Sequence, residues 1–130
     1  MHPDEVLEAL ETASLDAGQF QHADHLKAAW ALLRREPLPA ALATFSSALS
    51  RLAAHHGKPQ HYHETVTWFF LFLLNERLAA MPAEHDWEEL EARNRDLFVP
   101  HRELLAAYYS PARLESPLAR RAFVLPDLRR

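Results

Sequence analysis

The chain of 130 residues contains no cysteine and only two glycines, Gly18 and Gly57. The absence of cysteine excludes disulfides, thiolate metal ligands and a cysteine nucleophile, and it suits a reducing compartment, so we expect a cytoplasmic protein. The most apolar run, Val66 to Leu74, is far shorter than the roughly 20 apolar residues that span a bilayer. The acidic, amphipathic segment from Met1 to Leu10 has no feature of a secretory signal, and no membrane association is expected.

A basic face is also missing. The net charge is -4 with the nine histidines neutral, and acidic and basic residues alternate along most of the chain. We therefore expect no nucleic-acid partner, since such proteins gather lysine and arginine on one face. Motifs of zinc proteases (HExxH), di-iron bundles, phosphate-binding loops and serine hydrolases are absent too. These absences leave room for a small site built from histidines.

Apolar residues recur at steps of three and four, and the alternation typical of strands is nearly absent. The pattern predicts an all-α fold, a single domain over residues 1–130 that forms a bundle of four to six helices with a short helical C-terminal tail. The expected helices cover residues 3–14, 21–35, 39–56, 62–80, 86–98 and 101–109. Gly57 is expected just after the third helix, and Ser110-Pro111 and Ser116-Pro117 should each begin a short turn of the tail.

The predicted helix 62–80 is apolar nearly all round, with Trp68, Phe69 and Phe72 beside its main stripe. Such a helix is either central in the fold or half-buried in an interface. A homodimer through residues 62–80 is therefore one expectation.

Histidines stand at the ends of three apolar stripes. His22 and His25 begin the helix 21–35, His56 ends the helix 39–56, and His63 begins the helix 62–80. Short connections make consecutive helices antiparallel, which brings these three helix ends to one pole of the bundle. We expect the four imidazoles to converge there. Five further side chains should surround them: Asp24, His55, His61, Tyr62 and Glu64.

This convergence predicts a site for one divalent transition metal, because neutral imidazole suits zinc, iron, copper and nickel. His22, His25 and His63 are the expected ligands, with His56 as a fourth ligand or an outer partner. Three protein ligands leave a position for water, dioxygen or a small-molecule substrate. Glu64 is the catalytic candidate, able to orient a ligand or to move a proton.

Other interpretations stay open. Histidines also cap helices and interact with helix dipoles; capping or loop roles are favoured for His55 and His61, and exposure for His2, His85 and His101, of which His101 could also lie near the site. The chain could be a non-enzymatic dimerisation or partner-binding module. It could also be a metal-free enzyme that uses His63 and Glu64 for acid–base chemistry.

Three short motifs carry a resemblance: Phe20-x-His22-x-x-His25-Leu26, His55-His56-Gly57-x-Pro59 and Tyr62-His63-Glu64-Thr65. With similar residues in the tail, around Tyr108-Tyr109 and Pro126-Asp127, the chain resembles a family of small uncharacterised bacterial helical proteins from Phe20 to Leu128. The resemblance implies a helical fold and a bacterial origin. It implies no catalytic roles.

Overall fold

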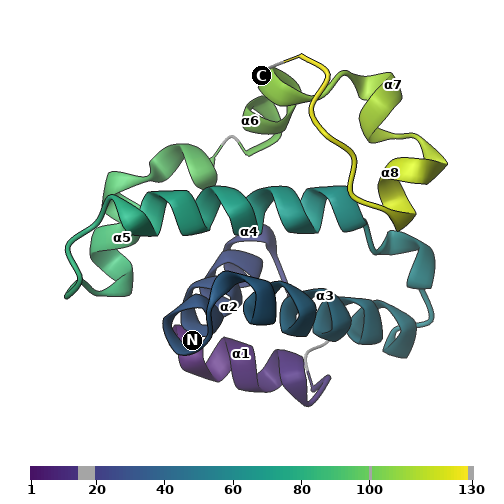
Figure 1. Ribbon diagram of the computed structural model, residues 1–130. Coiled ribbons are helices and arrows are strands. Elements are labelled where there is room, and N and C mark those ends of the chain that lie inside the picture. The colour runs from purple at the N-terminus through teal and green to yellow at the C-terminus, as the bar shows by residue number, and fades with distance from the viewer. Residues whose placement is uncertain (15–19, 100, 129–130) are drawn as a thin grey trace.

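One apolar helix, α4 (Glu64–Ala79), lies in the middle of the fold between two groups of helices. The computed structural model describes residues 1–14, 20–99 and 101–128. Figure 1 shows α2 and α3 below α4, and α6, α7 and α8 above it. This placement explains the sequence of α4, because a helix that is covered on both sides is apolar around most of its circumference.

The first group consists of α1 (Pro3–Glu11), α2 (His22–Arg35) and α3 (Leu38–His55). α1 packs on α2, and both α2 and α3 contact α4. Apolar residues at helical spacing make these contacts and are almost fully buried, among them Val6, Leu7, Leu10, Leu26 and Ala29. The stripes that predicted these helices are therefore their core faces.

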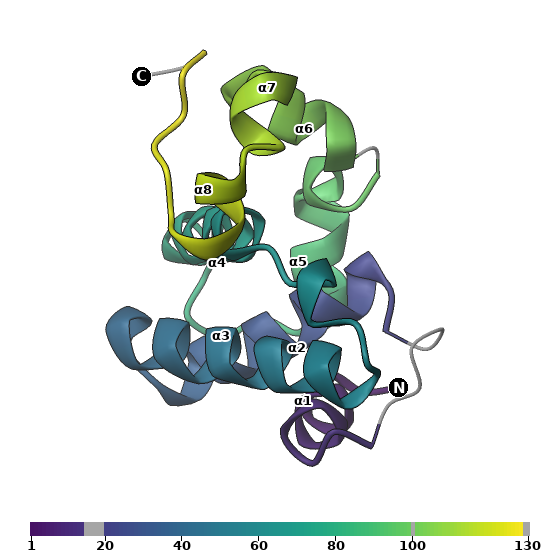
Figure 2. The same ribbon diagram turned by 90° about the vertical axis from the view of Figure 1, so that its right-hand side faces the viewer.

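The second group is made of shorter pieces: α5 (Trp87–Arg93), the 3-10 turn η3 (Arg95–Leu97), α6 (His101–Tyr108), α7 (Pro111–Leu114) and α8 (Pro117–Arg121). As predicted, a Ser-Pro pair starts each of the last two, and the hydroxyls of Ser110 and Ser116 accept hydrogen bonds from the amides three residues on. Figure 2 shows α8 lying against α4, while the chain that follows α8 runs away from α4 toward the C-terminus.

The all-α prediction is confirmed: α1 to α6 form the bundle, α7 and α8 form the helical tail, and no strand occurs in residues 1–14, 20–99 and 101–128. Most helix ends agree within three residues. The expected break at Gly18 falls outside the described residues. No helix in the described part of the chain has the length and apolar character needed to cross a membrane.

The prediction of one helix over residues 86–98 was wrong. α5 ends at Arg93, because the buried Asn94 leaves helical geometry with φ -133° and ψ 46°. Its amide nitrogen Nδ2 donates to the carbonyl of Leu90 at 2.9 Å, and its Oδ1 accepts from Arg77 Nη1 of α4 at 3.1 Å. An asparagine side chain that bonds nearby backbone competes with the helix in this way.

α4 is tied to the second group at both ends of their interface. At its start, the buried Thr65 Oγ1 donates to the carbonyl of Ala119 at 2.7 Å and accepts from the amide of Val124 at 3.1 Å. At its other end, Arg77 forms two hydrogen bonds with the carboxylate of Asp96, at 2.8 and 2.7 Å. A homodimer through the apolar face of α4 would have to displace this covering.

Candidate functional site: a histidine-lined cavity

Two local structures bring histidines to the space between α2, α3 and α4. The first is the start of α2, where the backbone amide of Gln21 donates to Asp24 Oδ2 at 3.0 Å. This contact satisfies an amide at the helix terminus. It fixes the first turn of α2, which carries His22 and His25 three residues apart on one side of the helix.

The second is the connection from α3 to α4. Gly57 follows the last turn of α3 with φ 72°, and its amide donates to Ala54 O at 2.9 Å. A residue with a Cβ strains in this left-handed conformation, which is why glycine ends the helix here. The chain then forms the 3-10 turn η2 (Pro59–His61) and reaches α4 through Tyr62 and His63.

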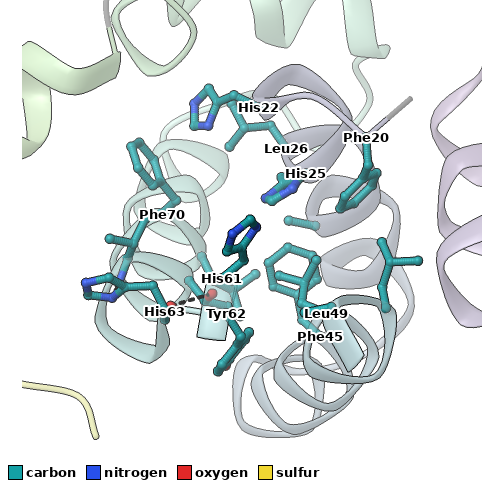
Figure 3. A pocket seen from close by; sticks show the side chains of 16 residues that line it. Phe20, His22, His25, Leu26, Phe45, Leu49, His61, Tyr62, His63 and Phe70 are labelled. Carbon is teal, nitrogen blue, oxygen red and sulfur yellow. Dashed lines mark hydrogen bonds between the residues drawn. The ribbon is translucent and has the colours of Figure 1, made fainter. Parts of the chain in front are cut away.

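A cavity of about 240 Å³ lies between these elements, as Figure 3 shows. Most of its wall is apolar, and none of the described residues that line it is an aspartate, glutamate, lysine or arginine. The lining comprises Phe20, His22, His25, Leu26, Ala29, Phe45, Leu49, Leu52, Ala53, His61, Tyr62, His63, Val66, Thr67, Phe70 and Leu71. A few polar groups on an otherwise apolar concave wall are typical of small-molecule sites.

His25 points into this cavity (Figure 3). One face of its ring stacks on Phe20, with ring centroids 4.1 Å apart. None of the described residues forms a hydrogen bond with its imidazole, and burial, followed by the nearby His22 and His101, lowers its pKa to about 4. At neutral pH the ring is therefore uncharged, with one nitrogen able to donate and the other able to accept.

His22 lines the same cavity, but its ring has other partners. Nε2 lies 2.8 Å from the carbonyl of Leu97 in η3, so it donates there. The ring stacks on His101 of α6 at 3.8 Å and meets the edge of Phe70 at 4.7 Å. Burial is the main cause of its lowered pKa, and the nearby His101 adds to it. His22 thus joins α2 to the second group of helices as a neutral ring.

His63 is the N-cap of α4. Its Nδ1 accepts from the amide of Val66 at 3.2 Å, and its Nε2 donates to the carbonyl of Leu114 in α7 at 2.8 Å. Both nitrogens are occupied only in the neutral form with the proton on Nε2. Burial again is the main cause of a lowered pKa. The ring therefore caps α4 and forms a hydrogen bond with α7.

Tyr62 and Glu64 form a pair beside the cavity. The Tyr62 hydroxyl donates a short hydrogen bond to Glu64 Oε1. Burial, and then this hydrogen bond, raise the pKa of Tyr62 to about 12. Glu64, the catalytic candidate, does not belong to the cavity lining, and its carboxylate is engaged with the tyrosine.

The structure brings three of the four predicted metal ligands, His22, His25 and His63, to one cavity, and it places His56 outside the lining. Two of these three rings donate to backbone carbonyls. Within residues 1–14, 20–99 and 101–128, no three histidine, aspartate or glutamate side chains are grouped so that they could hold a metal ion. In this arrangement the imidazoles surround a space and do not meet at a point.

His61, expected beside the predicted site in a loop or capping role, is on the cavity wall. Two other histidines were expected to be exposed. His101 is half-buried against His22. His85 accepts from Trp30 Nε1 at 3.1 Å, while its Nδ1 lies 2.8 Å from Pro82 O. The contacts of His101 with His22 and of His85 with Trp30 join distant segments, which local sequence patterns do not predict.

Compared with known proteins, the chain matches no protein-family model, no curated protein and no solved structure. The function is therefore argued from the cavity itself.

Proposed function

We propose that this chain binds a small, mostly apolar molecule in the cavity between α2, α3 and α4, with His25 as its principal polar contact. One observation carries the proposal: a neutral imidazole faces an apolar cavity and none of the described residues forms a hydrogen bond with it. A few polar groups placed on an apolar concave wall are typical of small-molecule sites, and a neutral imidazole can both donate and accept. A ligand hydroxyl or carbonyl would supply the partner.

The size of the cavity supports the same conclusion. At about 240 Å³ it is larger than an engineered apolar cavity of about 150 Å³ that takes up benzene. A ligand of one or two rings would fit, and burial of its surface stabilises the complex by about 25 cal/mol per Å² of apolar area. His61 is the exposed member of the lining, which places the opening of the cavity at η2.

Ligand-observed NMR with a panel of one- and two-ring fragments tests the proposal. The panel includes neutral, acidic and basic fragments. Ala53 lines the cavity, whereas its neighbour Ala54 is exposed on α3. Ala53→Phe should fill the space and abolish binding, and Ala54→Phe should leave binding intact. The proposal is wrong if no fragment binds, or if every bound fragment also binds to folded Ala53→Phe.

Metal binding is a second candidate, favoured by the presence of four imidazoles, those of His22, His25, His61 and His63, in the lining of one cavity. Coordination by the predicted set would require His22 and His63 to leave the carbonyls of Leu97 and Leu114. A divalent transition metal bound there would offer an open position to a small-molecule substrate. Elemental analysis of protein purified without a histidine tag, before and after addition of zinc, iron, copper or nickel, tests this candidate. Failure to take up any of them would exclude it.

A further inference from the structure

We infer that the cavity selects an uncharged aromatic molecule of one or two rings that carries a hydroxyl or carbonyl group. This inference rests on the proposed function and names the chemical class of its ligand. The charge, the ring content and the polar group of that ligand each follow from a different feature of the wall.

The charge of the ligand follows from the lining residues that the structure describes, none of which has an ionised side chain. The charged residues of α2 nearest the cavity have partners elsewhere: Asp24 accepts from the amide of Gln21, and Lys27 Nζ donates to Met1 O at 3.2 Å. A carboxylate in the cavity would lose its hydration and gain no cation. Burial of an unpaired ion is costly enough that such ligands are rejected or neutralised.

A cationic ligand meets the same obstacle. Glu64, which follows the lining residue His63 in the chain, accepts from Tyr62 and is not part of the wall. Aromatic faces can attract ammonium groups, by roughly 0.5–2 kcal/mol, but His22 and His25 are nearby bases held neutral by burial. An environment that disfavours imidazolium also disfavours an ammonium ion.

The ring content follows from the aromatic side chains around the space. Phe20, Phe45 and Phe70 lie on different sides of it (Figure 3). Phe20 already stacks on His25, and Phe70 meets His22 edge-on. Aromatic pairs in such geometries contribute about 0.5–1.5 kcal/mol beyond the area that they bury. A flat ligand can therefore extend an existing arrangement of rings.

The polar group follows from His25. A neutral imidazole offers one donor and one acceptor, so a hydroxyl or a carbonyl suits it. Of the other polar groups of the wall, His22 and His63 bond backbone carbonyls, and the Thr67 hydroxyl donates to His63 O at 2.8 Å. The ring of His61 is exposed, whereas His25 is more deeply placed. His25 should consequently decide between a ligand with one polar group and the same ring without it.

Four probes that share one ring system test the inference: 2-naphthol, naphthalene, 2-naphthoate and 2-naphthylmethylammonium. Their dissociation constants are measured at neutral pH by calorimetry or by tryptophan fluorescence. We expect 2-naphthol to bind about tenfold more tightly than naphthalene, which is the effect of one good hydrogen bond, and more tightly still than either ion. This series uses the unaltered protein and does not depend on the folding of a variant.

His25→Phe should remove the advantage of 2-naphthol, so that its dissociation constant becomes equal to that of naphthalene in the same variant. The matched control is His55→Phe, at an exposed position of α3 outside the lining, which should change neither value. Equal or tighter binding of 2-naphthoate or of the ammonium probe would overturn the ligand class while the proposed function stands. So would binding of other fragments to the cavity with none of the four probes bound. If no fragment and no probe binds at all, the proposed function fails as well.

Discussion

The two sides of α4 are built from similar residues and differ in how completely they are packed. On the side of α8 and the chain end, Trp68 stacks on Phe123 with centroids 5.4 Å apart, and the Thr65 hydroxyl is bonded to two backbone segments. On the side of α2 and α3, Val66 and Phe70 border a cavity of about 240 Å³. One side is closed by the protein itself, and the other leaves room for a second molecule.

The core is less completely packed on the side of α4 that faces α2 and α3, where the proposed binding site lies. Unfilled space in a core reduces stability, and unpaired polar groups reduce it further. Among the described residues, the His25 imidazole faces this space without a hydrogen bond from the protein, whereas the Thr65 and Tyr109 hydroxyls on the opposite side are paired with backbone carbonyls. Natural proteins keep such locally unfavourable features where a function requires them. The predictions below change one side at a time.

The largest effect is expected at Thr65 on the closed side. Thr65→Val removes the hydroxyl that donates to Ala119 O and accepts from the amide of Val124. Two buried backbone groups then lack partners, at about 1–3 kcal/mol each, so the variant should lose about 2–4 kcal/mol of unfolding free energy. Thr67→Val makes the same chemical change on the cavity side, where the hydroxyl donates to the carbonyl of His63, the N-cap of α4.

Urea unfolding of both variants measures the difference. Thr67→Val should cost less than about 1 kcal/mol, since the carbonyl that it leaves keeps its helical partner. Equal losses in the two variants would contradict the view that the closed side depends on Thr65.

Lowering the pH should reduce the unfolding free energy by a nearly equal amount, through His25 on the cavity side of α4. Histidines in an unfolded chain have a pKa near 6.5, and burial lowers the pKa of His25 to about 4. Between these values the unfolded chain binds more protons, so stability is full above about pH 6.5 and falls as the pH drops toward 4. At about 1.4 kcal/mol per pH unit, His25 alone accounts for a loss of about 3 kcal/mol.

Urea titrations between neutral pH and pH 4 measure this loss, and His25→Phe should reduce it substantially. His22, His63 and His101 also have pKa values lowered by burial, so part of the acid sensitivity should remain in the variant. The exposed His55→Phe is the control. An identical pH profile for the unaltered protein and for His25→Phe would show that His25 is not held neutral by the fold.

The sequence predicted the helices, but it predicted the roles of the histidines only in part. The stripes through Leu26 and Phe45 predicted α2 and α3, because local spacing determines which helix face is buried. The same stripes placed His22, His25 and His63 near one space. They could not show that the carbonyls of Leu97 and Leu114 would accept hydrogen bonds from His22 and His63. Those carbonyls lie 75 and 51 residues away in the sequence.

The start of α4 illustrates a second reason. Because the helix begins at Glu64 and not at Tyr62, His63 is an N-cap. Helix ends are the least certain part of any sequence-based assignment, and a shift of two residues turned an expected metal ligand into a capping group. His61, expected beside the site from the connection before this helix, lies on the cavity wall at the end of η2.

His63 lies where the two sides of α4 meet, and its replacement separates capping from the contact with α7. His63→Asn keeps a good N-cap side chain but is too short to reach Leu114 O, so it should cost about 1 kcal/mol. His63→Ala loses both contacts and should cost about 2 kcal/mol. Binding of 2-naphthol to His63→Asn should be unchanged, because both nitrogens of His63 are already engaged with the backbone. Equal stability of the two variants would show that capping by residue 63 contributes nothing to the unfolding free energy. Loss of 2-naphthol binding in His63→Asn would show that His63 contacts the ligand directly.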